Sequence, residues 1–347
     1  MAAGSTHSDR SPAALLAHAA ARGMRAQARA ALPTAALFAP QDPIDDRTRA
    51  AMSDRLERLV QGCAERLADR AAARLEAAAE PALAARLRRE AEQVWERLTA
   101  IPALWDEGLL AELLAETRLA LLAAGLPERA PFHPDQPSLL ARLAHSEDAT
   151  IAEAAKLLLL HGSGTTDAAG VQQLWWPIAA ALRARTTDAE EIALLDRALT
   201  SAVEELRGQD ADAPAAARLA RALRRDVATL PELVEHALSD RRLELAVALV
   251  ADAGGLGPRA VRDLVLERDP APLLILLRAV DLPRATLARI VFALCEADPA
   301  RDLDHYADVL DEVAAVPLQQ AWQAVAAMAL PAGYRAALLA FAESRPA

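Results

Sequence analysis

Three carboxylates in the last quarter of the sequence are spaced so that they could act together. Asp304, Asp308 and Asp311 stand four and three residues apart, which places them on one face of a helix, with His305 beside them. A site for a divalent cation needs oxygen ligands that converge from more than one element. One acidic stripe on one helix is typical of a face in contact with water, so the sequence predicts no metal site here.

A second group of residues has the types that bind phosphate. Gly254, Gly255 and Gly257 directly precede Pro258, the first residue of an expected helix, and Arg259 follows it. Backbone N–H groups at a helix N-terminus can bind anions. Proline removes one of these donors, however, and glycine-rich turns are common between the helices of repeat proteins. We therefore interpret this stretch as a turn and predict no bound cofactor.

The familiar sequence motifs of enzymes are not formed. A P-loop requires GxxxxGK[ST], and the only lysine, Lys156, lies within the helical stretch EAAKLL. No HExxH occurs. The stretch HGSG at 161–164 resembles part of a nucleophile elbow, but it does not form GxSxG and it follows a helix rather than a strand. We predict no catalytic residue and expect that the protein is not an enzyme.

Two adjacent tryptophans have the residue type that best suits recognition of another protein. On a helix, Trp175 borders an apolar stripe that includes Ile178 and Leu182, whereas Trp176 points well away from this stripe. A tryptophan outside a core stripe is a typical interface anchor. The alternative is that Trp176 packs on a neighbouring helical unit, and a helix that begins at Pro177 would remove the argument about faces. Trp175 and Trp176 are the candidate partner-binding residues.

The elements that must position these residues follow from a repeat in the second half of the chain. A proline opens a helix at Pro231, Pro258 and Pro283, which are 27 and 25 residues apart. Each of these helices is paired with a second helix, and the second helices at 243–250 and 273–280 are apolar on almost every side. Such helices must be covered on every side, as they are in helical-repeat arrays.

Composition places the chain among all-α proteins. Of its 347 residues, 53% are hydrophobic but only 3% are aromatic, and the strong helix formers alanine and leucine dominate. The formal net charge of −11 opposes non-specific binding of nucleic acid, which needs a basic face. Cys63 and Cys295 are too few for a disulfide scaffold, and no uncharged apolar run of about 18 residues occurs. We expect a cytoplasmic protein without a transmembrane segment.

The expected fold is an N-terminal helical bundle followed by a HEAT-like α-helical repeat array, an α-solenoid. Residues 1–45 are expected to form an N-terminal arm, partly disordered or a single helix. Residues 46–126 form the expected bundle, and residues 137–347 form the expected repeat domain with its C-terminal capping helices, in which Trp322 is interpreted as a packing residue. The loop at 126–138, with its four prolines, is the expected boundary.

Four stretches of the chain resemble a known family in their residues and in their order along the chain. They are LFAPQDPIDDRTRAAM at 37–52, LLARLAHSEDATIAEAAKLLL at 139–159, WWPIAAALRAR at 175–185 and PAPLLILLRAVDLPRATLARIVFAL at 270–294. In order and texture they resemble a bacterial family of uncharacterised HEAT-like helical-repeat proteins, known only as a domain of unknown function. The resemblance covers most of the chain from about residue 30. It implies an all-helical cytoplasmic protein without an assigned activity, and it implies no functional residues.

These observations predict a non-enzymatic cytoplasmic scaffold or adaptor that binds another protein. Because the chain is acidic, the partner could present a basic face, and a second copy of the chain is another candidate partner. Two alternatives stay open. A nucleic-acid-binding array would use arginines such as Arg221, Arg224 and Arg225 in a continuous basic groove. A small-molecule-binding or hydrolytic protein would have converging polar groups between the two helical halves, near residues 126–138.

Overall fold

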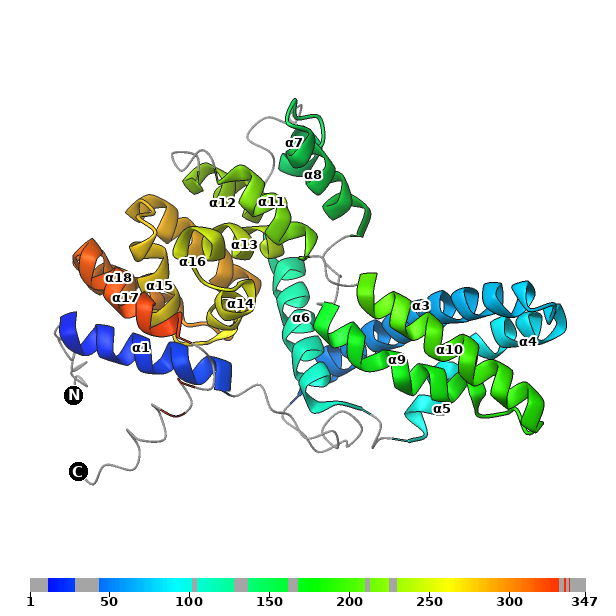
Figure 1. The fold of residues 1–347 in the computed structure, drawn as a ribbon. Helices are drawn as coiled ribbons and strands as arrows, with labels where there is room; N and C mark the ends of the chain where they lie inside the picture. The colour runs from blue at the N-terminus through cyan, green and yellow to red at the C-terminus, as the bar shows by residue number, and fades with distance from the viewer. Residues whose placement is uncertain are drawn as a thin grey trace, which may run out of the picture. The chain divides into compact units, whose positions relative to one another are not determined.

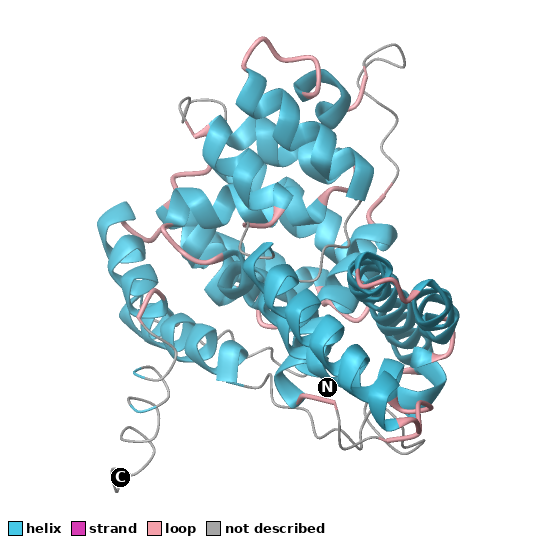
Figure 2. Cartoon of the chain, turned by 45° about the vertical axis from the view of Figure 1, so that its right-hand side comes forward, coloured by secondary structure: helices cyan, strands magenta, loops and turns pink. Residues whose placement is uncertain are grey.

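The computed structural model describes residues 12–28, 44–101, 105–127, 137–161, 168–209, 213–224 and 230–330, together with Tyr334 and Ala337. Within these residues the regular secondary structure is α-helical and no strand occurs, which confirms the predicted all-α class (Figure 1, Figure 2). The Pro-rich loop at 128–136, the glycines of the HGSG stretch and the arm residues 29–43 lie outside the described residues.

The chain forms two compact units, each with its own hydrophobic core. Unit 1 comprises residues 1–29, 119–163 and 215–347, and unit 2 comprises residues 30–118 and 164–214. Both units are discontinuous in sequence because α9 (Ala168–Arg183) and α10 (Ala189–Gln209) pack on α3 (Asp46–Ala77). This grouping differs from the continuous domains expected at 46–126 and 137–347, since two helices that follow the Pro-rich loop belong to unit 2.

Unit 1 is built mainly from short helices joined by tight turns (Figure 1). As predicted, Pro231, Pro258 and Pro283 lie at the starts of three helices. A proline is tolerated there because the N–H group that it lacks would have no partner within the helix. The helices are α1 (Pro12–Ala28), α7 (Leu139–Leu143), α8 (Ala149–His161), α11 (Ala215–Leu223), α12 (Leu230–Ser239), α13 (Leu243–Gly254), α14 (Pro258–Leu266), α15 (Ala271–Ala279), α16 (Arg284–Ala297), α17 (Leu303–Ala314) and α18 (Leu318–Met328).

The core of unit 1 surrounds α13 and α15. Nearly every residue of these two helices is buried, from Leu245 to Ala251 in α13 and from Ala271 to Leu277 in α15. Helices α11, α12 and α14 cover α13, while α1, α17 and α18 cover α15. The all-round apolar character read from the sequence is therefore confirmed as all-round burial, and burying such side chains supplies most of the driving force for folding.

Three turns of unit 1 end their helices in the same way. A residue one or two positions after the helix has a left-handed backbone, with φ of 55° at Arg241, 64° at Gly255 and 58° at Asp281. The N–H group of the next residue then donates to a carbonyl five residues earlier, for example Leu256 to Ala251 at 2.9 Å. This cap satisfies carbonyls that the helix end leaves free and reverses the chain sharply. Left-handed caps thus recur in these turns, as prolines recur at the helix starts.

Helix α1 packs against the C-terminal helices of unit 1, and Figure 1 shows it in blue beside α17 and α18 in orange. Leu15 and Ala19 are buried in this contact. The His18 ring Nε2 lies 2.6 Å from Asp269 Oδ2, and Arg22 Nε lies 3.4 Å from the same oxygen. Burial disfavours ionisation of Asp269, but the hydrogen bonds to its carboxylate and the charge of Arg22 outweigh burial and hold the pKa of this group below its usual value.

Unit 2 is organised around the long helix α3. Asp45 caps its start, because the side chain accepts a hydrogen bond from the Thr48 N–H at 2.8 Å. The buried side chains of α3 recur every three or four residues along one side. Ion pairs join the outer edges of the helices, such as the pairs that Arg70 and Arg74 form with Glu205 of α10 at 2.9 and 2.6 Å. The other helices are α4 (Pro81–Ala91), α5 (Val94–Thr99) and the first part of α6 (Glu107–Gly125).

Candidate interaction surface

An apolar groove with a volume of about 260 Å³ opens on the surface of unit 1. Five helices build it, namely α11, α12, α13, α15 and α18, and the turn after α15 completes it. The groove therefore depends on the packing of unit 1 as a whole and corresponds to no single stretch of sequence. The apolar residues that define its walls and floor are Leu223, Leu230, Leu233, Leu249, Val280 and Trp322.

The walls of the groove carry apolar side chains that unit 1 does not fully bury. Leu249 of α13 is buried in the floor, whereas Leu223 and Leu233 are half-buried at the edge. Trp322 is 41% exposed and stands one helical turn after Leu318, so both side chains face the groove. A concave apolar surface beside an exposed tryptophan is typical of the anchor points of protein interfaces.

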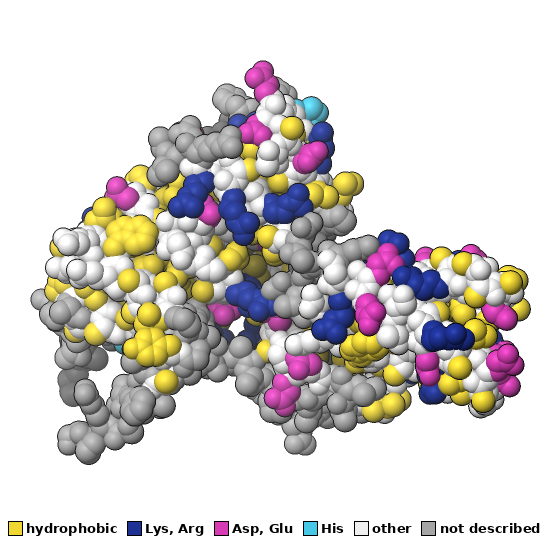
Figure 3. Space-filling model, viewed as in Figure 1, with side chains coloured by type: hydrophobic (Ala, Val, Ile, Leu, Met, Phe, Trp, Pro, Cys, Tyr) yellow, Lys and Arg dark blue, Asp and Glu magenta, His cyan; other side chains and the backbone are white. Residues whose placement is uncertain are grey.

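Charged side chains flank the groove. Arg224 lines it and is 68% exposed at its side chain, with Nε 3.5 Å from Asp252 Oδ2. Arg218, Arg221 and Arg224 follow one another at three-residue steps along α11 and into the residue that ends it, and Figure 3 shows Lys and Arg side chains in a row over this helix. Within the described residues, neither Arg218 nor Arg221 forms an ion pair. Two carboxylates, Asp252 and Asp281, also line the groove, and each lies near an arginine, since Asp281 pairs with Arg278 at 3.3 Å. The charge beside the groove that has no described counter-charge is therefore the basic charge of α11, although the whole chain carries a net charge of −11.

Comparison with known families recognises the segment that contains the whole groove. A family model described as an uncharacterised protein conserved in bacteria, DUF2336, matches residues 128–326. The chain belongs to DUF2336. No curated protein and no solved structure matches it. The match confirms the resemblance to an uncharacterised bacterial family, while the HEAT-like repeat stays a prediction because the family description does not mention one.

The two tryptophans predicted as partner-binding residues lie in the part of the DUF2336 segment that belongs to unit 2. Helix α9 continues through Pro177, so the argument from helix faces applies. Trp175 is 0% exposed and the Arg66 guanidinium lies 5.3 Å from the centre of its ring, whereas Trp176 is 44% exposed. Of the pair, only Trp176 presents its ring to solvent. Its role in partner binding stays a prediction.

Sequence reasoning missed the groove tryptophan of the DUF2336 segment. Trp322 was expected to pack among capping helices, yet a large part of its ring is exposed on α18. The buried residues of α18 are Ala321, Ala324, Val325 and Met328, which define the stripe that faces the core. Trp322 lies about 100° from Ala321 around the helix, at the edge of this stripe, and that offset was the available signal.

A second, polar pocket of unit 1 has a volume of about 360 Å³ and lies on α12 and α16 beside Pro127. Glu235 is engaged on both oxygens, since Thr286 Oγ1 donates to Oε1 at 2.7 Å and Arg289 pairs with Oε2. The hydroxyl of Ser239 donates to the backbone carbonyl of Glu235 at 2.9 Å. This serine is therefore held by its own helix rather than by a base.

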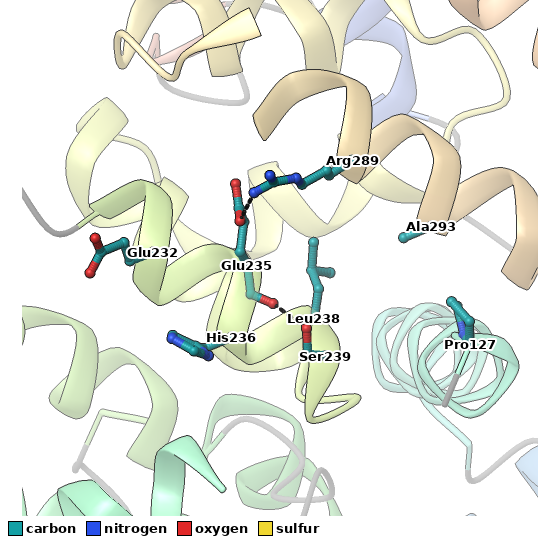
Figure 4. Close-up of a pocket in the computed structure, with 8 residues that line it drawn as sticks. All are labelled: Pro127, Glu232, Glu235, His236, Leu238, Ser239, Arg289 and Ala293. Carbon is teal, nitrogen blue, oxygen red and sulfur yellow. Dashed lines mark hydrogen bonds and ion pairs between the residues drawn. The ribbon is translucent and has the colours of Figure 1, made fainter. Parts of the chain in front are cut away.

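Figure 4 shows that the polar side chains of this pocket do not converge. Glu235 reaches toward Arg289, while Glu232 and His236 project from other sides of α12. A catalytic set needs nucleophile, base and orienting group within hydrogen-bond reach of one another. The arrangement of Glu235, Arg289 and Thr286 instead joins α12 to α16, and it supports a structural role for these residues in the DUF2336 segment.

The remaining chemical candidates of the sequence are separated or already engaged. Asp311 forms an ion pair with Arg284, and among the described residues no group of three or more His, Cys, Asp or Glu side chains is arranged to hold a metal ion.

Gly255 provides the left-handed turn after α13, as the turn interpretation predicted. Neither Cys63 nor Cys295 forms a disulfide with a described residue, and burial raises the pKa of Cys295. In the described part of the chain, no helix is long and apolar enough to span a membrane.

Proposed function

We propose that this DUF2336 protein is a non-enzymatic cytoplasmic adaptor that binds a protein partner in the apolar groove of unit 1. The observation that carries the proposal is the exposed Trp322 beside the half-buried Leu223 and Leu233 on one concave surface. Truncating such an anchor in an interface typically costs 2 kcal/mol or more, about a 30-fold loss of affinity. Trp176 of α9 is a second, separate candidate contact.

We further propose that α12 to α18 form a short HEAT-like array. Two features support this proposal, namely the recurring helix-opening prolines and the recurring left-handed caps at Arg241, Gly255 and Asp281. In such arrays each pair of helices covers the next, and the surfaces between pairs are the usual binding surfaces. The groove supports this proposal because four helices of the proposed array, α12, α13, α15 and α18, line it together with α11.

Nucleic-acid binding is the competing function with an observation in its favour, which is the arginine row of α11. Single-stranded nucleic acid is bound by a charged track combined with several aromatic rings on which bases stack. The groove offers one aromatic ring, Trp322, and its floor is aliphatic. The surface therefore suits apolar side chains better than a series of bases.

Site-specific photocrosslinking in the native cells tests the adaptor proposal. A photoreactive phenylalanine analogue is placed at position 322 or 318 in the groove, at position 176 on α9, and at position 292 as a control. Phe292 is 45% exposed on α16 of the same unit and does not line the groove. We expect a reproducible protein adduct from 322 and 318 that is absent from 292.

The outcomes of this experiment separate the alternatives. An adduct with a second copy of the chain would identify the protein as a homo-oligomer that uses the groove for assembly. An adduct only from 176 would move the binding site to α9. If positions 322 and 318 yield no more adduct than position 292, the groove is not a protein-binding site and the proposal is wrong.

A further inference from the structure

The basic row beside the groove provides information about the partner. The groove residues of α11 are Ala220, Leu223 and Arg224, so Arg224 belongs to the groove wall, and Arg221 is exposed on the adjacent side of the same helix. Both arginines lie in or directly after the last turn of α11, where the negative end of the helix dipole favours a cation. These charges are thus fixed next to an apolar surface.

The charges of the row are available to a ligand. Arg221 forms no ion pair with a described residue, and the single pair of Arg224 with Asp252 is long, at 3.5 Å between Nε and Oδ2. A guanidinium has five N–H donors in a planar fork that matches a carboxylate. Arg224 therefore keeps free donors even while it contacts Asp252, and Arg221 keeps all of them for an outside acceptor.

We propose that the groove receives an amphipathic helix of a partner protein whose polar side is acidic. This inference rests on the proposed adaptor function and adds the chemistry of the partner. Apolar anchors at helical spacing would enter the groove beside Trp322, and carboxylates on the flank of the same helix would meet Arg221 and Arg224. The volume of about 260 Å³ lies below the usual range of small-molecule pockets, about 300 to 1,000 Å³, and suits a few aliphatic side chains.

The proposal reverses the expectation from net charge. A chain with a charge of −11 attracts a basic partner at long range, but at an ionic strength near 0.1 M charges farther apart than about 10 Å are largely screened. Under these conditions the local row decides which helix binds. An acidic helix then gains charge-assisted hydrogen bonds from α11, while a basic helix meets like charges beside its anchors.

Designed peptides make this inference testable without knowledge of the partner. Three fluorescent probes are used with the full chain at 0.1 M salt: a helical peptide with leucine anchors and glutamate on its polar side, the same peptide with lysine in place of glutamate, and a single-stranded oligonucleotide. Affinity is measured by fluorescence anisotropy. We expect the acidic peptide to bind about tenfold more tightly than the basic peptide.

Variants locate the effect. Arg221→Glu alone should weaken binding of the acidic peptide several-fold, and R221E/R224E should weaken it about tenfold or more and favour the basic peptide. The control R142E/R268E changes the net charge by the same amount at two exposed arginines of unit 1 that do not line the groove, and it should leave both affinities within about twofold. Trp322→Ala should weaken both peptides by a similar factor, because it removes the shared anchor.

Several results would overturn the inference. They are equal or tighter binding of the basic peptide, no binding of either peptide up to about 1 mM, or equal effects of the two double variants. Competition by the oligonucleotide for the same arginines would replace the protein partner with nucleic acid. The adaptor proposal is judged separately, because a photocrosslinked partner at position 322 together with no charge preference among the peptides would leave the function intact and refute only the acidic helix.

Discussion

Helix α15 of unit 1 and helix α3 of unit 2 bury apolar residues in different ways. Helix α15 is nine residues long and buries Leu273, Leu274 and Ile275 in succession, so three different directions around the helix point into protein. Helix α3 is 32 residues long and buries Leu56, Val60 and Cys63 at steps of four and three, so one side points into protein and the other meets water.

The difference shows how units 1 and 2 reach different helix arrangements with similar alanine- and leucine-rich compositions. A helix with one apolar stripe needs neighbours on one side, which is the logic of a bundle. A helix that is apolar all round is stable only when neighbours enclose it, and around α15 these are α17 and α18, which follow it in the sequence, and α1, which is far from it in the sequence. The central helices of unit 1 therefore depend on neighbours in every direction, whereas unit 2 can also draw on ion pairs at its outer edges.

The largest expected effect comes from truncating successive residues of α15. Leu273→Ala, Leu274→Ala and Ile275→Ala should each cost about 2 to 5 kcal/mol in the free energy of unfolding, because each leaves a cavity in a packed interior. On α3 the matching scan should be uneven, with a similar cost for Leu56→Ala and a cost below about 0.5 kcal/mol for the exposed Arg58→Ala. Urea unfolding followed by circular dichroism measures both series. If one of the three substitutions on α15 left the free energy of unfolding almost unchanged, this helix would have a face exposed to solvent.

A close approach of two backbones in unit 1 gives the next largest effect. A Cβ atom on Gly125, at the end of α6, would lie 2.5 Å from the Ala297 carbonyl oxygen. Gly125→Ala should therefore force the backbone apart and cost about 1 to 3 kcal/mol. The control is Gly62→Ala in α3, where no atom lies within 4 Å of the new Cβ, and alanine should stabilise the helix by about 0.5 to 1 kcal/mol. Thermal unfolding of both variants tests the opposite signs, and equal signs would contradict the structure.

The left-handed caps allow a reciprocal exchange between the two units. Gly255 in unit 1 has φ of 64°, and Ala79, which follows α3 in unit 2, has the same φ of 64°. Because alanine is strained in this region, Gly255→Ala should lose about 1 kcal/mol and Ala79→Gly should gain up to about 1 kcal/mol. The change in the midpoint of denaturant unfolding reports each effect. Loss of stability in both variants would show that the caps differ in more than backbone conformation.

The smallest effect concerns the ion pairs of unit 2. Glu205→Gln removes the charge that Arg70 and Arg74 share, and because the Glu205 side chain is about one-third exposed the cost should stay below about 1 kcal/mol. The cost should shrink further in 1 M salt, which screens partly exposed charges. Glu57→Gln, at an exposed position of α3, is the matched control and should be neutral at both salt concentrations. An effect of Glu205→Gln that does not depend on salt would point to packing rather than charge.

The sequence predicted the features of this fold that depend on neighbouring residues. The prolines at 231, 258 and 283 indicated helix starts, and the unbroken apolar runs at 243–250 and 273–280 indicated full burial, because both follow from local chemistry. The matching of α9 and α10 to α3 was not predicted. It depends on side-chain complementarity across more than a hundred residues, such as Arg74 with Glu205, and spacing along the chain does not show it.

The candidate site was less accessible to sequence reasoning than the fold. Trp176 was correctly expected to lie outside the core stripe of α9, since one helix suffices for that inference. The groove around Trp322 is formed by residues of five helices, so no local sequence motif predicts it. Arg224 likewise becomes a candidate contact only because Leu223 of α11 and Trp322 of α18 line the same groove.

The position of α1 sets the order in which the protein can be completed during synthesis. This helix leaves the ribosome before the segments of unit 2, yet its contacts are with α14, α15, α17 and α18, which are made last. At about 5 to 20 residues per second, α1 waits on the order of tens of seconds before its partners appear. Unit 2 receives all of its segments earlier and can fold in the interval. Leu15 and Ala19 of the waiting helix can become buried only after these partner helices have been made.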